Sequence, residues 1–466
     1  MVEVRVDLVV TIITTSVMYH KVMKELSKVD NESIICQIRI VDVARNRNDA
    51  SEPRSEFAAT FESLLRSEPL TCRSSHKIHE GLPAPCVAVI DSFASYAIDA
   101  IGKRIPVFMW RTSPAGSILR HNGPPELGGR TESDSPPDVI TSSDRPATVV
   151  QIPGAPPMYD YEWTLQEVAY PPGLVQTVWK TAGRVAQITD GVLNVSCSAF
   201  EPGAIAAAED WYKSMGKNWY SVGPLSLPPN KYAAAVATRE TEFLDKMKGR
   251  FGEKSVIYIA FGSSPWLPLP NKLWIVIDEL ITHCVPFLLA HPSRSSHVPD
   301  EHTAKINDSG LGLEVEWVDQ EAVLSHPATG WFLTHGGWNS LQEAFVHKIP
   351  CIFFPFSADQ PYNAAMITLK HRAGFELLSV REKGSKPPFR CNGASDEKMF
   401  TDEAVRKEVR GLLVQLKGPG GQMVRNNAES LGRTMLSCWN EGQESARNLE
   451  RFLRQFADRP EEVPTG

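Results

Sequence analysis

The chain has 466 residues, of which 42% are hydrophobic, so its length allows two or three domains with substantial cores. A net charge of −7 and the lack of any basic run argue against nucleic-acid binding, and no apolar stretch is long enough to span a membrane. The eight cysteines form no Cys-x-x-Cys pair and no close cluster with histidine, so we expect reduced thiols, no metal site and a cytoplasmic protein. The first seven residues alternate charged and apolar side chains, which does not predict a secretory signal.

Apolar strand-like runs alternate with helical stretches along the chain, which predicts an α/β fold with two doubly wound parallel sheets. Near the start, a run at 7–14 leads into a helical pattern that contains His20, and a second run follows at 38–43. The run at 86–90 ends on Asp91, which places that carboxylate at the carboxyl edge of a sheet, where open α/β folds bind ligands. The alternative for Asp91 is a simple helix cap.

Two further segments stand out in composition or pattern. The range 113–163 is rich in Pro, Gly, Ser and charge, which predicts a long mobile loop, with a disordered insertion as the alternative. At the end of the chain, a helical pattern over 445–456 places Leu449, Phe452 and Leu453 on one stripe. That stripe predicts a helix packed back on the body of the protein.

A strand, a glycine turn and a helix follow one another after residue 329. The run at 330–334 is apolar and bounded by glycine, as a buried parallel strand should be. The His-Gly-Gly sequence at 335–337 then turns the chain, and Asn339 and Ser340 are expected to cap the next helix. A helix amino terminus offers free N–H groups and a positive dipole end, which suits a diphosphate. No Gly-Lys-Ser/Thr signature is present, which argues against an ATPase-type loop.

The segment that contains this turn opens on Trp317 and closes on Asp359-Gln360, 44 positions in all. It resembles, in length and in motif, the donor-binding signature box of the UDP-dependent family 1 glycosyltransferases of plants and fungi. The run SVIYIAFGSS at 255–264 resembles the family's first C-terminal strand, and YSVGPLSLP at 220–228 resembles its interdomain segment. The resemblance therefore covers nearly the whole chain.

The resemblance implies the GT-B fold, in which two Rossmann-like domains face a cleft. We accordingly expect an N-terminal acceptor-side domain, an interdomain linker, a C-terminal UDP-sugar-binding domain, and a C-terminal helix and tail. In this order, the expected ranges are 1–222, 223–250, 251–440 and 441–466.

The resemblance also implies a donor site that needs no metal or other cofactor. The indole of Trp317 would stack on uracil, the Val318 backbone would bond the base edge, and Gln320 would close that turn. Glu343, four residues after Asn339 on one helix face, would accept both ribose hydroxyls. The diphosphate and the sugar would be contacted by Ser263, His335, Gly337, the Trp338 N–H, Asn339, Ser340, Asp359 and Gln360.

Each of these residues also has a purely structural reading. Trp317 and Trp338 could be core aromatics, Glu343 could be a first-turn acid, and Ser263 could be a turn former. Most family members have Ala-Pro where this chain has Val318-Asp319, so the base-side loop could sit differently. The fixed spacing of the whole set favours the donor site, and the closing glutamine favours glucose.

In this family a histidine after the first strand removes the acceptor's proton, and an aspartate at the end of a later strand orients it. Asp91 fits the orienting role, and Thr112 matches a position that faces the transferred sugar. No Gly-His with a nearby Pro is found near the start, where 6–26 resembles the family's second strand and helix. His20 is the alternative base, although its helical context predicts a surface residue.

The N-terminal domain is therefore expected to lack its first strand unit, as in a truncated or mis-spliced reading frame. Without a central strand, either two strand edges stay unpaired inside one domain or the neighbouring strands pair directly. Unpaired buried backbone groups cost about 1–3 kcal/mol each.

Two functions remain open at this point. The first is an inverting glycosyltransferase that moves a hexose, with glucose favoured, from a UDP-sugar to a hydroxyl of a small lipophilic acceptor. The alternative is a catalytically impaired UDP-sugar-binding protein, and the 44-position box disfavours a third reading, a sugar-nucleotide epimerase. The expected partners are the UDP-sugar and the acceptor, and we expect a monomer without a membrane span.

Overall fold

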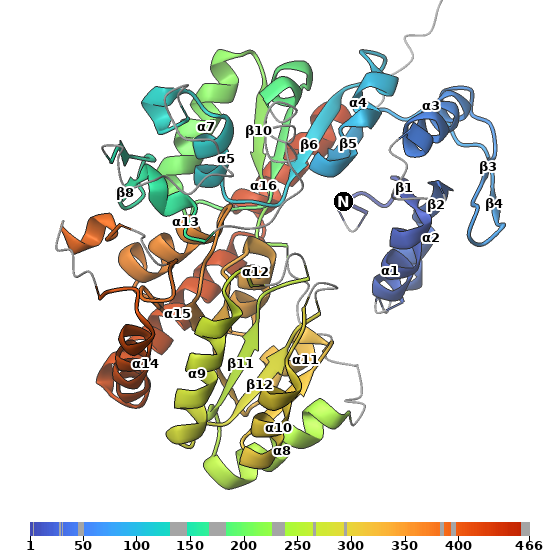
Figure 1. Ribbon diagram of the computed structural model, residues 1–466. Coiled ribbons are helices and arrows are strands. Elements are labelled where there is room, and N and C mark those ends of the chain that lie inside the picture. The colour runs from blue at the N-terminus through green and yellow to red at the C-terminus, as the bar shows by residue number, and fades with distance from the viewer. Residues whose placement is uncertain are drawn as a thin grey trace, which may run out of the picture.

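The computed structural model describes residues 1–2, 4–27, 29, 31–44, 51–130, 147–166, 183–225, 238–263, 267–292, 296–382, 386–392 and 398–457. Within these ranges, two parallel sheets with flanking helices form the body of the molecule (Figure 1). The α/β class expected from the alternating pattern is thus confirmed.

The C-terminal sheet has six parallel strands in the order β13-β12-β11-β14-β15-β16. Every residue of β11 and β14 is buried, as befits strands at the centre of a sheet that is covered on both faces. The strand expected at 330–334 is therefore confirmed. The bounds are β11 (Val256–Ala260), β12 (Phe287–Ala290), β13 (Gly312–Val315), β14 (Thr329–Thr334), β15 (Cys351–Phe353) and β16 (Gly374–Glu376).

Helices cover this sheet, with α9 packed against α14 and α12 against α15. Their apolar stripes supply the core, as in α14, where Val405, Val409, Leu412 and Leu413 are buried. The bounds are α8 (Arg239–Phe251), α9 (Pro270–Thr282), α10 (Asp300–Ser309), α11 (Gln320–Ser325), α12 (Trp338–Val346), α13 (Gln360–Ala365), α14 (Asp402–Lys417) and α15 (Pro419–Ser437). A π-helical turn, η4 (Met366–Lys370), follows α13, and a 3-10 turn, η5 (Phe389–Cys391), follows β16.

The N-terminal half holds a four-stranded parallel sheet in the order β10-β9-β6-β5. The last helix, α16 (Glu444–Phe456), returns to this sheet, where Phe452 packs on Phe108 and Tyr220. The predicted packing of the C-terminal helix on the body is confirmed. The bounds are β5 (Ala88–Asp91), β6 (Val107–Arg111), β9 (Gly191–Asn194), β10 (Asn218–Ser221), η1 (Ser92–Ala94), α4 (Tyr96–Ile101), α5 (Ala115–Asn122) and α7 (Pro202–Ser214).

The first strands of the chain form a separate unit. The strands β1 (Val10–Thr15) and β2 (Ile38–Ala44) pair in parallel with each other, and within the described ranges neither is hydrogen-bonded to β5. Figure 1 shows this unit set apart from the larger N-terminal sheet. The helix α3 (Ser51–Leu65) connects this unit to the four-stranded sheet, because Phe57 and Phe61 lie in one core with residues of α4. The unit also contains α1 (Ser16–Leu26), α2 (Glu32–Cys36), α3 (Ser51–Leu65), β3 (Leu70–Thr71) and β4 (Ile78–His79).

A missing first strand was expected either to leave two strand edges unpaired or to make the neighbouring strands pair directly. In the described structure β1 and β5 do not pair with each other, which agrees with the first of these outcomes. This arrangement does not test whether the reading frame is truncated, which stays a prediction.

The prediction of a mobile loop over 113–163 is wrong for part of that range. The helix α5 follows Pro114 directly and is buried from Ala115 to Arg120. The prediction failed because the start of α5 is held by a distant side chain, Glu201, which accepts hydrogen bonds from two of its backbone amides. Further on lie η2 (Pro125–Leu127), the hairpin β7 (Val149–Val150) with β8 (Met158–Tyr159), and η3 (Asp160–Trp163). The stretch 131–146 lies outside the described residues.

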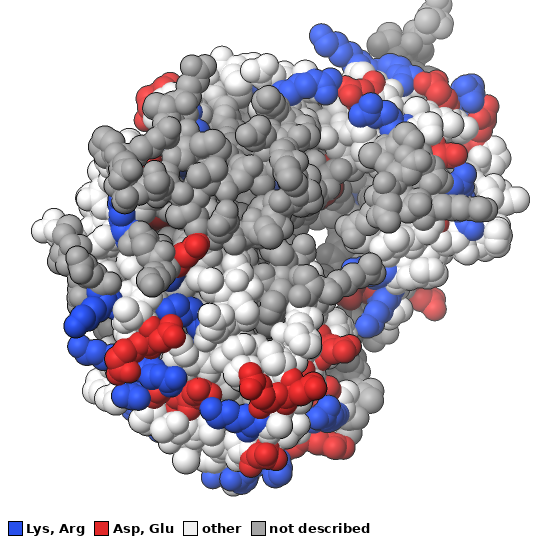
Figure 2. All heavy atoms as spheres, in the orientation of Figure 1, with Lys and Arg blue, Asp and Glu red and all other residues white. Residues whose placement is uncertain are grey.

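Charged side chains are mixed in sign over the described surface. On the face shown in Figure 2, acidic and basic residues alternate across the C-terminal half. The described residues on this face therefore form no broad basic patch of the kind that attracts a polyanion.

Candidate functional site

Two glycines shape the turn at the carboxyl edge of the C-terminal sheet. Gly336, after β14, has φ +88°, and a Cβ atom there would lie 2.8 Å from the Phe353 ring. Gly262, after β11, has φ +78°, and its Cβ would lie 3.1 Å from the His335 imidazole. Both positions combine a left-handed backbone with a close approach, so glycine is the residue that fits. Because β11 and β14 are neighbours, Ser263 and His335 emerge at the same edge.

His335 lies in an apolar setting at this edge. Its ring stacks on Phe356 with centroids 5.8 Å apart, and Nδ1 is 3.4 Å from the Thr334 hydroxyl. Burial lowers the pKa of His335 to about 4, so the imidazole is neutral at pH 7. A neutral imidazole carries one N–H, which can donate a hydrogen bond to an anion.

The expected capping of α12 by Asn339 and Ser340 is wrong. The helix begins at Trp338 with Gly337 as its N-cap, which places Asn339 and Ser340 within the first turn. The Trp338 amide instead donates to Asp359 Oδ2 at 3.2 Å. The sequence pattern missed this because the capping carboxylate comes from the next strand-to-helix loop.

The Asp359 carboxylate is enclosed at the start of α12. It also accepts a hydrogen bond from Asn363 Nδ2 at 3.0 Å, while the same amide group donates to the Gly336 carbonyl at 2.8 Å. Burial raises the pKa of Asp359 to about 6, against the lowering effect of these hydrogen bonds. The loop that carries Asp359 is thereby tied directly to the glycine turn.

Gln360, the first residue of α13, orders the same loop. Its Oε1 atom accepts from the backbone amides of Phe356 at 3.0 Å and Ser357 at 3.2 Å. The carbonyl of Phe356 in turn accepts from the amides of Leu165 and Gln166 in the N-terminal half. The loop between β15 and α13 is therefore fixed from both halves of the protein.

A second cluster of polar side chains lies where α12 packs against α11. Gln320, the first residue of α11, accepts from the Tyr258 hydroxyl at 3.0 Å and donates to Ser340 Oγ at 3.4 Å and to the Glu343 carboxylate. Burial raises the pKa of Glu343, and the hydrogen bond from Gln320 opposes that shift. The structure therefore brings Gln320, Ser340 and Glu343 together.

The loop before α11 presents an aromatic ring to the outside. The side chain of Trp317 is 58% exposed, whereas Val318 beside it is buried. Asp319 caps α11, since its carboxylate accepts from the Ala322 amide at 3.3 Å. An exposed indole next to a buried loop residue offers an aromatic face held by a fixed backbone.

On the N-terminal side, Asp91 and Thr112 lie at the carboxyl ends of paired strands. Asp91 is the last residue of β5, and Thr112 directly follows β6, so both are exposed at one edge. Burial lowers the pKa of the Arg111 guanidinium, while the nearby Asp91 charge opposes that shift. Arg111 donates to Ser92 Oγ at 3.2 Å and to Asn122 Oδ1 at 2.8 Å.

His20 lies on the outside of α1. Its side chain is exposed, and its ring meets Tyr19 edge-on at 5.5 Å. This placement agrees with the surface reading of His20 and gives no support to its alternative reading as a catalytic base.

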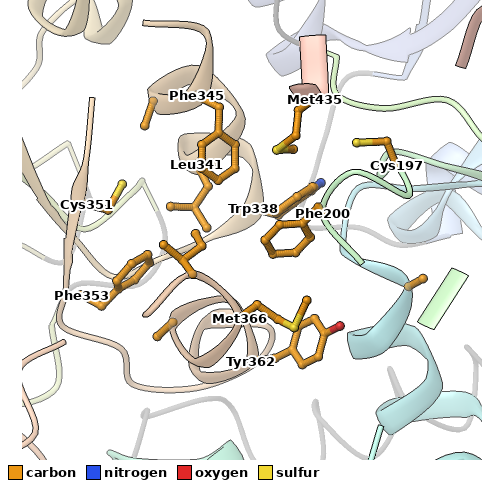
Figure 3. Packing of buried hydrophobic residues seen from close by; sticks show 14 of the residues in the cluster. Cys197, Phe200, Trp338, Leu341, Phe345, Cys351, Phe353, Tyr362, Met366 and Met435 are labelled. Carbon is orange, nitrogen blue, oxygen red and sulfur yellow. The ribbon is translucent and has the colours of Figure 1, made fainter. Parts of the chain in front are cut away.

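The two halves meet through Trp338 and Glu201. The indole of Trp338 donates to the Val195 carbonyl, and its ring lies 4.7 Å from that of Phe200 (Figure 3). The structural reading of the Trp338 side chain as a core aromatic is thus correct, and its backbone N–H still lies at the helix start. Tyr362 on α13 donates to Glu201 Oε2 at 2.9 Å, which joins the donor-side helix to α5.

Within the described ranges, no group of three or more His, Cys, Asp or Glu side chains is placed to hold a metal ion. Across the same residues, none of the helices is long and apolar enough to cross a membrane.

Comparison with known proteins identifies a family that the chain resembles. Residues 234–386 match the family model described as "UDP-glucoronosyl and UDP-glucosyl transferase". Over this segment the chain is similar to the UDP-glycosyltransferases.

Two curated UDP-glycosyltransferases illustrate the likeness. UDP-glycosyltransferase eriJ of Hericium erinaceus is 29% identical over 326 residues, which are 66% of this chain and 63% of that protein. Anthocyanidin 3-O-glucosyltransferase 2 of Fragaria ananassa is 31% identical over 252 residues, which are 52% of this chain and 48% of that protein. The chain thus spans about half to two thirds of the length of these relatives.

Solved structures match over nearly the whole chain. UGT2 of Phytolacca americana, complexed with UDP-2-fluoro-glucose and pterostilbene, has a TM-score of 0.69 at 18% identity and covers 98% of this chain and 94% of its own. A transferase from Siraitia grosvenorii in complex with UDP has a TM-score of 0.70 at 18% identity, with the same coverage. The expected GT-B fold is confirmed.

The predicted donor residues fall into two adjoining groups. One surrounds the glycine turn and contains Ser263, His335, Gly337, Trp338, Asp359 and Gln360. The other lies on the α11 side and contains Trp317, Val318, Gln320, Ser340 and Glu343. Asn339 is exposed between the two groups, in the first turn of α12.

Sequence reasoning missed two charged residues near these groups. Glu201 accepts a hydrogen bond from Tyr362 on α13, and Lys24 has its ammonium 4.4 Å from the centroid of the Trp317 ring. No local motif marks either of them, because each contact joins segments far apart in the chain.

Proposed function

We propose that this protein is an inverting glycosyltransferase that moves a hexose from a UDP-sugar to a hydroxyl group of a small lipophilic acceptor. The observation that carries the proposal is the glycine turn between β14 and α12, where the helix start, the neutral His335 and the Asp359 carboxylate converge. The names of the relatives support it, since one is a glucosyltransferase for anthocyanidins. Glucose is favoured because the donor segment closes on Gln360.

The roles of the donor residues follow from their placement. The exposed Trp317 ring would stack on uracil, and Glu343 would accept the ribose hydroxyls after exchanging its hydrogen bond from Gln320. The diphosphate would lie over the start of α12, where backbone amides and the dipole stabilise its charge. Ser263, Asn339 and Ser340 would add side-chain hydroxyl and amide contacts there.

The chemical step is a single displacement at the anomeric carbon. The acceptor oxygen forms a bond to this carbon as the bond to the diphosphate oxygen breaks, and UDP leaves with the bonding pair. The N–H of neutral His335 and the amides at the start of α12 would stabilise the developing charge, without a metal ion. The acceptor proton must pass to a base, and Asp91 with Thr112 marks the strand edge where the acceptor would lie.

We infer that the protein is a cytoplasmic monomer. We also propose two domains joined by a linker at 223–250. The helix α8 packs against β11 and α11, so we propose that the linker proper ends before residue 239.

The direct test is release of UDP from UDP-glucose by the purified chain with a panel of small phenolic acceptors. We expect acceptor-dependent release together with one glucoside per UDP. UDP binding without release with any acceptor would instead favour the impaired donor-binding protein. That second candidate rests on the lack of pairing between β1 and β5 in the described structure and on the surface position of His20.

The pH dependence of donor binding tests the role of Asp359. Because the pKa of this carboxyl is about 6, we expect UDP-glucose to bind more weakly as the pH falls below 6 and the carboxylate stops accepting hexose hydroxyls. UDP-glucose is the suitable ligand, since it has no terminal phosphate that titrates near pH 6. Calorimetry should show this acidic limb in the wild type and its absence in Asp359→Asn.

The same shift predicts an effect on stability with a defined sign. A folded-state pKa above the ordinary 3.8 means that the folded protein binds this proton more readily than the unfolded chain. The free energy of unfolding of the wild type, relative to Asp359→Asn, should therefore fall as the pH rises from about 4 to about 6. A rise over that interval would contradict the assignment.

A further inference from the structure

The contact between Lys24 and Trp317 joins two parts of the chain that the proposed reaction does not otherwise connect. The Lys24 ammonium, in the last turn of α1, lies 4.4 Å from the centroid of the Trp317 ring. In Figure 1, α1 lies below β1 and β2, at about the height of α12 in the C-terminal half. A cation over an indole face is attracted by the ring quadrupole.

The neighbouring residue, Glu25, also lies near the donor site. The Glu25 charge is among the causes that raise the pKa of Glu343, so the last turn of α1 is also close to that carboxylate. Glu343 is the proposed ribose ligand, and it lies beside Gln320 in the α11 group. The last turn of α1 therefore lies close to both Trp317 and Glu343, the two residues proposed to hold the nucleoside.

We propose that the last turn of α1 is a gate over the nucleoside end of the donor site. Lys24 covers the indole face that uracil needs, and Glu25 adds a negative charge beside the carboxylate that binds ribose. Donor binding must displace both side chains. The inference rests on the proposed function, because it concerns the same donor site, and it adds a competing contact from within the chain.

The size of the effect follows from the contact. A cation–π contact at an exposed site is worth a factor of about two to five in an equilibrium constant. Both Lys24 and Glu25 are exposed side chains on a surface helix, so removing either should leave the fold intact.

The test is calorimetric titration of UDP into the wild type, Lys24→Ala and Lys21→Ala. We expect Lys24→Ala to bind UDP about two- to fivefold more tightly. Lys21→Ala removes the same charge from an exposed position on the same helix and should bind as the wild type does. Unchanged or weaker binding by Lys24→Ala would overturn the gate while leaving the donor site in place.

Two further measurements ask whether Lys24 acts through the indole and whether α1 is released when UDP binds. In a Trp317→Ala background, Lys24→Ala should no longer change the affinity, because the shared ring is gone. Saturation of the wild type with UDP should speed hydrogen exchange of the α1 amides, and slower or unchanged exchange would overturn the proposal. If none of the proteins binds UDP, the proposed donor site fails, and the gate fails with it.

Discussion

Replacing Trp317 by alanine is expected to raise the Kd for UDP about 5- to 150-fold, the range that base–aromatic stacking of about 1–3 kcal/mol implies. The ring is 58% exposed and outside the core, so its loss should not unfold the protein. Most of the effect should appear as weaker binding of every uridine nucleotide, since the lost contact is to the base. Calorimetry with UDP and UDP-glucose measures it.

The matched control is Trp317→Phe, which keeps an aromatic face of smaller area and should retain most of the affinity. Loss of the Lys24 contact in Trp317→Ala works in the opposite direction, because it frees the last turn of α1. That gain is at most about fivefold, so the full 5- to 150-fold rise in Kd is expected when both proteins compared carry Lys24→Ala. Equal affinity of Lys24→Ala and the double variant with Trp317→Ala would remove uracil stacking from the proposed function.

The sequence predicts those parts of the site that lie within one strand-turn-helix segment. The buried strand before His335 and the glycine turn follow from apolar periodicity and from glycine, both of which act locally. The cap of α12 was misplaced because Asp359 reaches it from another loop. The helix α5 was missed for the same reason, since Glu201 lies far along the chain from the amides that it binds.

The split of the N-terminal sheet shows a different limit. Its strands were recognisable from their apolar runs, and a gap was expected from the resemblance. No local pattern predicts where α1 lies when β1 and β5 do not pair with each other. The contact of Lys24 with the donor site depends on that position, and it could be found only in three dimensions.

Replacing Glu201 by alanine is expected to lower the free energy of unfolding by about 3–5 kcal/mol. The carboxylate is 1% exposed and accepts from the Ala115 amide at 2.6 Å, the Gly116 amide at 2.9 Å, the Ser196 hydroxyl at 2.5 Å and the Tyr362 hydroxyl at 2.9 Å. The substitution leaves these four buried donors without their acceptor. Urea denaturation measures the loss.

Tyr362→Phe is the matched control, because it removes one of the four donors and leaves the carboxylate bound to the other three. Its cost should be about 1 kcal/mol, well below that of Glu201→Ala. Glu201→Gln keeps the shape of the side chain but turns an NH2 group toward at least one donor, so its cost in unfolding free energy should fall between those of the other two variants.

Because Glu201 ties α5 to α13, which begins at Gln360, the alanine variant should also lose affinity for UDP-glucose more than for UDP. An alanine variant as stable as Tyr362→Phe would show that water replaces the carboxylate, and that the two halves are not held together at this point.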